Sequence, residues 1–162
     1  MSAAAILLPV DGAQLTELKQ IAAEGGPVLH MMRGDSPRFT SFGEVYFSEV
    51  LPGHVKAWKR HSLMTQHFVV PVGRVRVVLF DDRKSSPTYQ RLAEVTLGRP
   101  YDYRLLRIPP QVWYGFAALG DYPALIANCT DIPHRQGESE RAPVDAPFIP
   151  FSWAEVDLSA QG

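Results

Sequence analysis

The chain has 162 residues, a mass of 18.0 kDa and a formal net charge of −1, so its length fits one domain and neither sign of charge predominates. This balance does not require a basic face, and it gives no reason to expect a nucleic acid or an anionic membrane as a partner. Apolar residues make up 46% of the chain, which is enough for one buried core. We therefore expect a small-molecule partner, with no nucleic acid and no membrane.

We expect a cytoplasmic protein from the first ten residues and the single cysteine. Residues 1–10 are apolar, but they carry no positive charge and are too short to span a bilayer, so they resemble neither a signal peptide nor a membrane helix. Cys129 has no second cysteine to pair with and lies in an apolar run, where a buried thiol is expected.

A short helix is predicted after Asp11, which can act as an N-cap with Gln14 three residues on. Apolar residues then recur at helical spacing, and Gly25-Gly26-Pro27 would end the helix. These apolar positions are Leu15, Leu18, Ile21 and Ala22. We expect residues 1–27 to form an N-terminal segment outside the main domain.

From residue 28 onward, short runs rich in Val, Ile, Phe and Tyr alternate with Gly, Pro and Asp, which is typical of many short strands. The predicted strands cover residues 43–50, 55–58, 66–70, 74–81, 93–97, 103–108, 113–119 and 124–129. Their number and spacing predict an all-β jelly-roll barrel over residues 28–153, followed by a tail over 154–162.

A spacing of Gly53, Lys59, His61, Gln66 and Gly73 resembles the first cupin motif, in which two histidines and a glutamate bind a metal inside a double-stranded jelly-roll barrel. Strand periodicity would direct the side chains at 59 and 61 to the same face. A protonated lysine has no lone pair, and glutamine is a weak neutral ligand. We expect a cupin-like barrel without a metal or another cofactor. A metal-dependent cupin with an unusual ligand set stays an alternative, which elemental analysis would decide.

Several segments resemble the dTDP-4-dehydrorhamnose 3,5-epimerase family, whose members are metal-free cupins. The resemblance runs from about Arg33 to Trp153 and depends on recurring blocks of residues. These are Asp82-Arg83, Ser86-Pro87-Thr88, Ile108-Pro109-Pro110, Gly115-Phe116, Cys129-Thr130-Asp131 and Glu138-Ser139-Glu140-Arg141. The resemblance implies a homodimer and proton transfer at a carbon next to a carbonyl.

The catalytic groups implied by this resemblance are a histidine base supported by an aspartate, a lysine for the enolate oxygen and a tyrosine acid. Aligned on the family, Lys59 holds the base position, with His61 two residues on, and either could act as the base. Tyr114, in the second cupin motif, is the candidate for a second acid or base. Asp145 lies near the supporting aspartate, and Gln66 holds the place of the enolate lysine.

The resemblance also implies a set of substrate-binding residues. Lys56 occupies the place of an arginine that contacts the nucleotide, and Arg33 the place of one that reaches the neighbouring subunit's nucleotide, a role for which Arg38 competes. Glu44 and Tyr46 fall where the family holds the thymine or the sugar-phosphate region. Apart from the resemblance, aromatic rings at a barrel mouth can stack on a sugar or a base, which makes Trp58 and Trp113 candidate binding residues. Arg76 is a further candidate for substrate binding.

We therefore expect an epimerase or isomerase that acts on a 4-keto-6-deoxy sugar nucleotide. The alternative is a catalytically inactive cupin that binds a sugar nucleotide, since Ile132-Pro133 follow Cys129-Thr130-Asp131 where the family has its tyrosine acid. A tight complex without turnover would favour that alternative.

Overall fold

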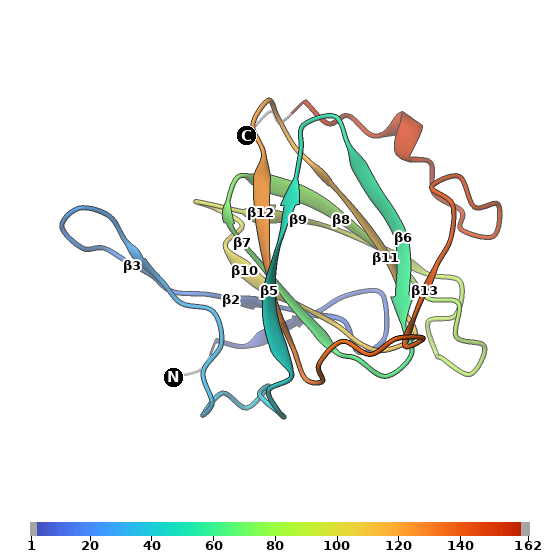
Figure 1. The fold of residues 1–162 in the computed structure, drawn as a ribbon, viewed down its shortest axis with the longest axis horizontal. Coiled ribbons are helices and arrows are strands. Elements are labelled where there is room, and N and C mark those ends of the chain that lie inside the picture. The colour runs from blue at the N-terminus through green and yellow to red at the C-terminus, as the bar shows by residue number, and fades with distance from the viewer. Residues whose placement is uncertain (1–2, 160–162) are drawn as a thin grey trace.

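Two antiparallel sheets pack face to face in the computed structural model, which describes residues 3–159 (Figure 1). The larger sheet contains, in spatial order, β1 (Ala5–Leu7), β2 (Gln14–Glu17), β10 (Arg104–Ile108), β7 (Gln66–Val72), β12 (Ala124–Thr130) and β5 (Glu44–Val50). The second sheet contains β13 (Ser139–Arg141), β6 (Val55–His61), β11 (Trp113–Ala118), β8 (Arg74–Phe80) and β9 (Leu92–Gly98). A separate hairpin of β3 (Gln20–Ile21) and β4 (Val28–Leu29) extends away from this body. The expected all-β jelly roll is confirmed.

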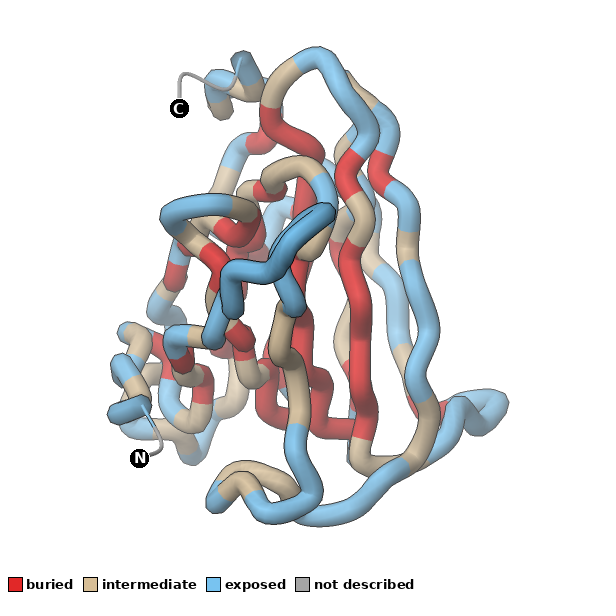
Figure 2. The backbone as a smooth tube through the Cα atoms, turned by 90° about the vertical axis from the view of Figure 1, so that its left-hand side faces the viewer, coloured by how far each residue is buried: buried red, intermediate tan, exposed pale blue. Residues whose placement is uncertain are grey.

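Alternating side chains of the central strands build two apolar layers. Along β8, Val75, Val77 and Leu79 point between the sheets, whereas Val78 and Phe80 point to the opposite face. That outer face is covered by the C-terminal segment, which includes the 3₁₀ helix η1 (Trp153–Glu155). Figure 2 shows the buried segments gathered inside the body, with exposed segments around them.

All eight predicted strands are present, but the predicted N-terminal helix is wrong. Gln14–Glu17 instead forms β2, which pairs with β1 on one side and with β10 on the other. Leu15 lies opposite Leu106 and is buried, whereas Ile21 is 44% exposed in the projecting hairpin. Pairing with β1 and β10, together with burial of Leu15, therefore outweighs the helical spacing of the apolar residues.

Gly73 joins β7 to β8 and should not tolerate a side chain. Its φ is +74°, and an added Cβ would lie 2.7 Å from the Cα of Ala124. Gly73→Ala is expected to lower the free energy of unfolding by about 2–4 kcal/mol, because left-handed strain adds to a backbone clash. Gly25→Ala is the matched control, since Gly25 has a φ of +82° but open space around it. Urea denaturation of both variants measures the difference, and equal losses would exclude the clash.

Candidate active site

A cavity of about 550 Å³ opens between the two sheets, with β5 and β12 on one side and β6 and β11 on the other. Its apolar floor includes Phe68 and Phe116. Its polar lining side chains include Tyr46, Ser48, Lys56, Lys59, Tyr114, Asn128 and Arg141. The volume lies within the range of small-molecule sites. Two of the expected catalytic residues, Lys59 and Tyr114, line this cavity.

His61, at the end of β6, is buried behind the cavity wall and hydrogen-bonded at both ring nitrogens. Its Nδ1 lies 2.6 Å from Oε2 of Glu138, and its Nε2 lies 3.2 Å from the hydroxyl of Tyr114. The other carboxylate oxygen of Glu138 accepts hydrogen bonds from the backbone N–H groups of Leu63 and Met64, both at 2.9 Å. Glu138 is therefore held as a carboxylate that faces one side of the imidazole.

The electrostatics of this group favour a neutral imidazole. Burial lowers the pKa of His61, and the hydrogen bond and the charge of Glu138 offset this only in part. Burial would raise the pKa of Glu138, but hydrogen bonds from His61 and the two backbone N–H groups bring it below its usual value. Burial also raises the pKa of the Tyr114 phenol well above its usual value. At neutral pH the group thus comprises a carboxylate, a neutral histidine and a phenol.

A second polar chain crosses the opposite wall. The Nδ2 of Asn128 on β12 donates to Oε1 of Gln66, at 3.0 Å, and to the hydroxyl of Tyr46, at 2.9 Å. Its Oδ1 accepts from the backbone N–H of His67 at 3.1 Å. Gln66 and Asn128 are each 1% exposed, so they position the more accessible Tyr46 at the cavity.

Three cations border the cavity. Lys59 and Lys56 come from β6, and Arg141 comes from the neighbouring strand β13, where it lies opposite Lys59 in the register. Burial lowers the pKa of Lys59, and the positive charge of Arg141 lowers it further. The Nζ of Lys56 donates to the backbone O of Glu49 at 2.6 Å and to Oγ of Ser48 at 3.2 Å. The cavity therefore suits an anionic ligand or an anionic intermediate.

Three of the expected binding residues face away from the cavity. The ring of Trp58 packs against Phe151 and Trp153 on the outer face, although the residue borders the cavity. Trp113 also lies on that face, where its Nε1 donates to Asp82 at 3.1 Å. Arg76 forms an ion pair with Glu94 at 3.0 Å on β9. None of the three presents its side chain to the interior of the barrel.

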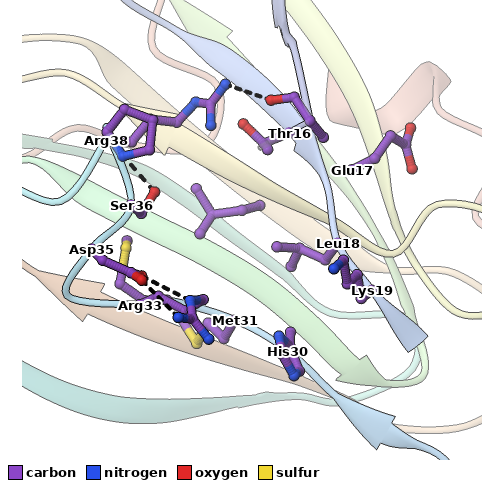
Figure 3. A pocket seen from close by; sticks show the side chains of 14 residues that line it. Thr16, Glu17, Leu18, Lys19, His30, Met31, Arg33, Asp35, Ser36 and Arg38 are labelled. Carbon is purple, nitrogen blue, oxygen red and sulfur yellow. Dashed lines mark hydrogen bonds and ion pairs between the residues drawn. The ribbon is translucent and has the colours of Figure 1, made fainter. Parts of the chain in front are cut away.

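The remaining expected residues also lie apart from the cavity. Asp145 is exposed in the C-terminal segment, and the carboxylate beside His61 is Glu138. Glu44 accepts from the backbone N–H of His134 at 3.1 Å, at the end of β5. Arg33 lies in a second cavity of about 790 Å³ and forms an exposed ion pair with Asp35 at 2.7 Å (Figure 3). The carbonyl oxygen of Ala3 accepts a hydrogen bond from Arg38, the competing arginine.

The comparisons with known proteins define the family. Residues 54–161 match the model of the family described as dTDP-4-dehydrorhamnose 3,5-epimerase. This chain belongs to that family. It is 34% identical over 152 residues to the probable low-salt glycan biosynthesis epimerase Agl13 of Haloferax volcanii, a match that covers 91% of this chain and 97% of the relative.

Solved structures agree with this assignment to the epimerase family. A dTDP sugar isomerase from Desulfovibrio desulfuricans is 79% identical, with a TM-score of 0.94, and the match covers 95% of this chain and 98% of the other. A Legionella pneumophila epimerase in complex with dTDP-4-keto-L-rhamnose has a TM-score of 0.81 at 20% identity, with 97% and 86% of the two chains covered. The second match shows the shared fold.

Three residues of the site are given no role by the sequence: Asn128 and Arg141, which line the cavity, and Glu138, which lies behind it on His61. Of the three, Asn128 has the clearest signal in the sequence, because a polar residue inside an apolar strand must find a hydrogen-bond partner. Glu138 and Arg141 lie in a polar stretch without strand periodicity, so only the fold brings them to β6. No cluster of three or more His, Cys, Asp or Glu side chains that could hold a metal occurs within residues 3–159. In the same part of the chain, no helix is long and apolar enough to cross a membrane.

Proposed function

We propose that this protein epimerises or isomerises a 4-keto-6-deoxy sugar nucleotide by proton transfer at a carbon next to the carbonyl. The observation that carries the proposal is the cavity in which Lys59 and Arg141 lie beside Tyr114, with His61 and Glu138 directly behind. Membership of the epimerase family and the 79% identity to a dTDP sugar isomerase support the substrate class.

The chemistry requires a base, a cation and an acid. Removal of a C–H proton next to a carbonyl leaves an enolate, whose oxygen needs a positive charge or hydrogen-bond donors nearby. Lys59 and Arg141 supply that charge, and the His61–Tyr114 pair supplies the exchangeable protons. Return of a proton to the same carbon from the other face gives the epimer, and return to a different atom gives an isomer.

The nucleotide part of the substrate would extend toward the more exposed end of β6. Lys56 lies there with its ammonium group at the cavity edge, and Tyr46, held by Asn128, faces it from β5. We propose that Lys56 contacts the phosphates and that Tyr46 contacts the sugar or the base. Trp58, Trp113 and Arg76 are left out, because their side chains face away from the cavity.

Proton NMR in heavy water tests the proposed reaction. With dTDP-4-dehydro-6-deoxyglucose, the purified protein is expected to replace the C3 or the C5 proton by deuterium, since both carbons adjoin the C4 carbonyl. The affected carbon would separate single from double epimerisation. Line broadening without exchange would contradict the enzymatic proposal and favour a protein that only binds sugar nucleotides. An unchanged spectrum would contradict this substrate altogether.

We also propose that the protein is a homodimer. The edge strand β5 carries exposed apolar side chains, including Phe47 at 63% and Val45 at 47%, which a second copy could cover. In such a dimer Arg33 would contact the partner subunit's nucleotide. Sedimentation equilibrium should give twice the chain mass.

A cytoplasmic location is part of the proposal, because the only cysteine, Cys129, is a buried free thiol that needs no oxidising compartment.

A further inference from the structure

The arrangement of His61 and Tyr114 raises the question of which group contacts the substrate. His61 is 2% exposed and is not among the residues that line the cavity, whereas Tyr114 lines it. The Tyr114 hydroxyl occupies the Nε2 side of the imidazole, at 3.2 Å, and Glu138 occupies the Nδ1 side. The histidine therefore has no ring nitrogen left for a substrate atom.

We propose that Tyr114 is the base that contacts the substrate, and that its own proton passes to His61, which Glu138 holds in the Nδ1–H form. Tyr114 and His61 then act as one acid–base unit, and Glu138 acts as a positioning residue. This inference rests on the proposed proton-transfer function and names the groups that carry it out.

The proposed step moves two protons in a balanced exchange. The substrate C–H proton moves to the phenol oxygen of Tyr114 while the O–H proton of Tyr114 moves to Nε2 of His61. The products of this step are an enolate, a neutral tyrosine and an imidazolium ion. The negative charge lies near Lys59 and Arg141, and the positive charge lies 2.6 Å from Glu138. Reversal of both transfers on this face regenerates the substrate, with deuterium at that carbon in heavy water, whereas inversion requires that a proton reach the enolate from the opposite face.

This route avoids two unfavourable species. A free phenolate would be costly at Tyr114, which is 5% exposed, but concerted transfer to His61 never forms one. A protonated His61 without Glu138 would be a buried, unpaired charge, and the carboxylate removes that cost. The donors and acceptors are also matched. The carboxylate of Glu138 accepts from Nδ1–H of His61, which leaves Nε2 to accept a hydrogen bond from the Tyr114 phenol.

Packing holds the tyrosine in place for this role. Its ring makes an edge contact with Phe68, with centroids 5.7 Å apart, and lies nearly parallel to the rings of His61 and Phe116. The charged or titratable groups that face the pair are Lys59 on β6, Arg141 on β13, Tyr46 on β5, and Glu138 and His134 from the segment before β13. Glu138 is the acidic member of this set that touches His61, so it sets the tautomer.

Nitrogen-15 NMR of the histidine rings tests the arrangement without substrate. His61 is expected in the neutral Nδ1–H tautomer, and the neutral Nε2–H tautomer would overturn the relay while leaving the proposed function intact. In Glu138→Gln, the side-chain oxygen can still accept the hydrogen bonds from the backbone N–H groups of Leu63 and Met64, so the NH₂ group would face Nδ1 of His61. His61 should switch to the Nε2–H form, and exchange into the substrate should fall on the order of 10³-fold or more, as expected for a base in the wrong tautomer.

Exchange kinetics of Tyr114→Phe test the contact with the substrate. This variant should lose at least 10³-fold in the rate of deuterium exchange while retaining dTDP binding, measured by calorimetry. Tyr103→Phe is the matched control, because Tyr103 is a buried tyrosine that donates to the backbone O of His30 outside the cavity. Substantial exchange by Tyr114→Phe, together with its loss in His61→Asn, would show that His61 meets the substrate directly and would overturn the relay. Absence of exchange in the wild-type protein would instead refute the proposed function, and the relay with it.

Discussion

Replacing Asp81 by alanine is expected to lower the free energy of unfolding by about 3–5 kcal/mol, which is the usual cost of removing one partner from a buried ion pair. Asp81 directly follows the strand β8 and is fully buried. Its carboxylate accepts two hydrogen bonds from the guanidinium of Arg83, both at 2.8 Å, and one from the backbone N–H of Arg83, at 3.1 Å. It also accepts one each from the hydroxyl groups of Ser86 and Thr88, at 2.6 Å. The alanine variant would leave all five donors without this acceptor.

Denaturation in urea measures this loss, and Asp35→Ala is the matched control. Asp35 also forms a two-hydrogen-bond ion pair with an arginine two positions away, but that pair is exposed to solvent. Exposed pairs contribute little, so the control should unfold as the wild type does. A loss in Asp81→Ala no larger than that of the control would show that burial does not strengthen the Asp81–Arg83 pair.

The same carboxylate makes stability depend on pH. Burial would raise the pKa of Asp81, but the hydrogen bonds from Arg83, Ser86 and Thr88 outweigh it and hold the pKa well below its usual value. A group whose pKa is lower in the folded state stabilises that state above its unfolded pKa, and this contribution is lost as the pH falls toward the folded pKa. Between about pH 4 and pH 2, wild-type stability should decline more steeply than that of Asp81→Asn.

The strands could be predicted well from the sequence, because they are short apolar runs, several of them rich in β-branched or aromatic residues, bounded by turn residues. The run from Arg74 to Phe80 is an example, since its apolar character matches a strand buried on both faces. The predicted N-terminal helix is wrong because the strand there pairs with a distant part of the chain. Leu15 lies opposite Leu106, and no local sequence pattern contains that partner. The helical spacing of apolar residues could not outweigh this pairing.

The site was predictable only in part, for a related reason. Lys59, His61 and Tyr114 lie in strands whose alternation points them inward, so their common location followed from periodicity. Glu138 lies 77 residues from His61, in a stretch without periodicity, and only the chain's return along β6 brings the two together. Trp58 and Trp113 were predicted to bind the ligand because aromatic rings can stack on it. In the structure both rings pack in the apolar layer on the outer face of the sheet.

Lys59→Met is expected to reduce the rate of substrate proton exchange by about 10²–10³-fold, the usual effect of removing one donor to a developing oxyanion. Lys59 lines the cavity beside Arg141, and both burial and that neighbouring charge lower its pKa. Because the variant removes a partly buried charge next to a like charge, its thermal stability should not fall. Lys84→Met is the matched control, since Lys84 is exposed in the loop after β8 and outside the cavity.

Lys59→Arg separates the two roles open to this lysine. A guanidinium stays protonated and keeps the positive charge, but it cannot remove a proton from carbon. If Lys59 stabilises the enolate, the arginine variant should retain a substantial part of the activity that the methionine variant loses. Equal inactivity of the two variants, with normal dTDP binding, would instead identify Lys59 as the base and would contradict the assignment of that role to Tyr114. Both rates come from the heavy-water NMR experiment, so the two outcomes are compared on one substrate and in one measurement.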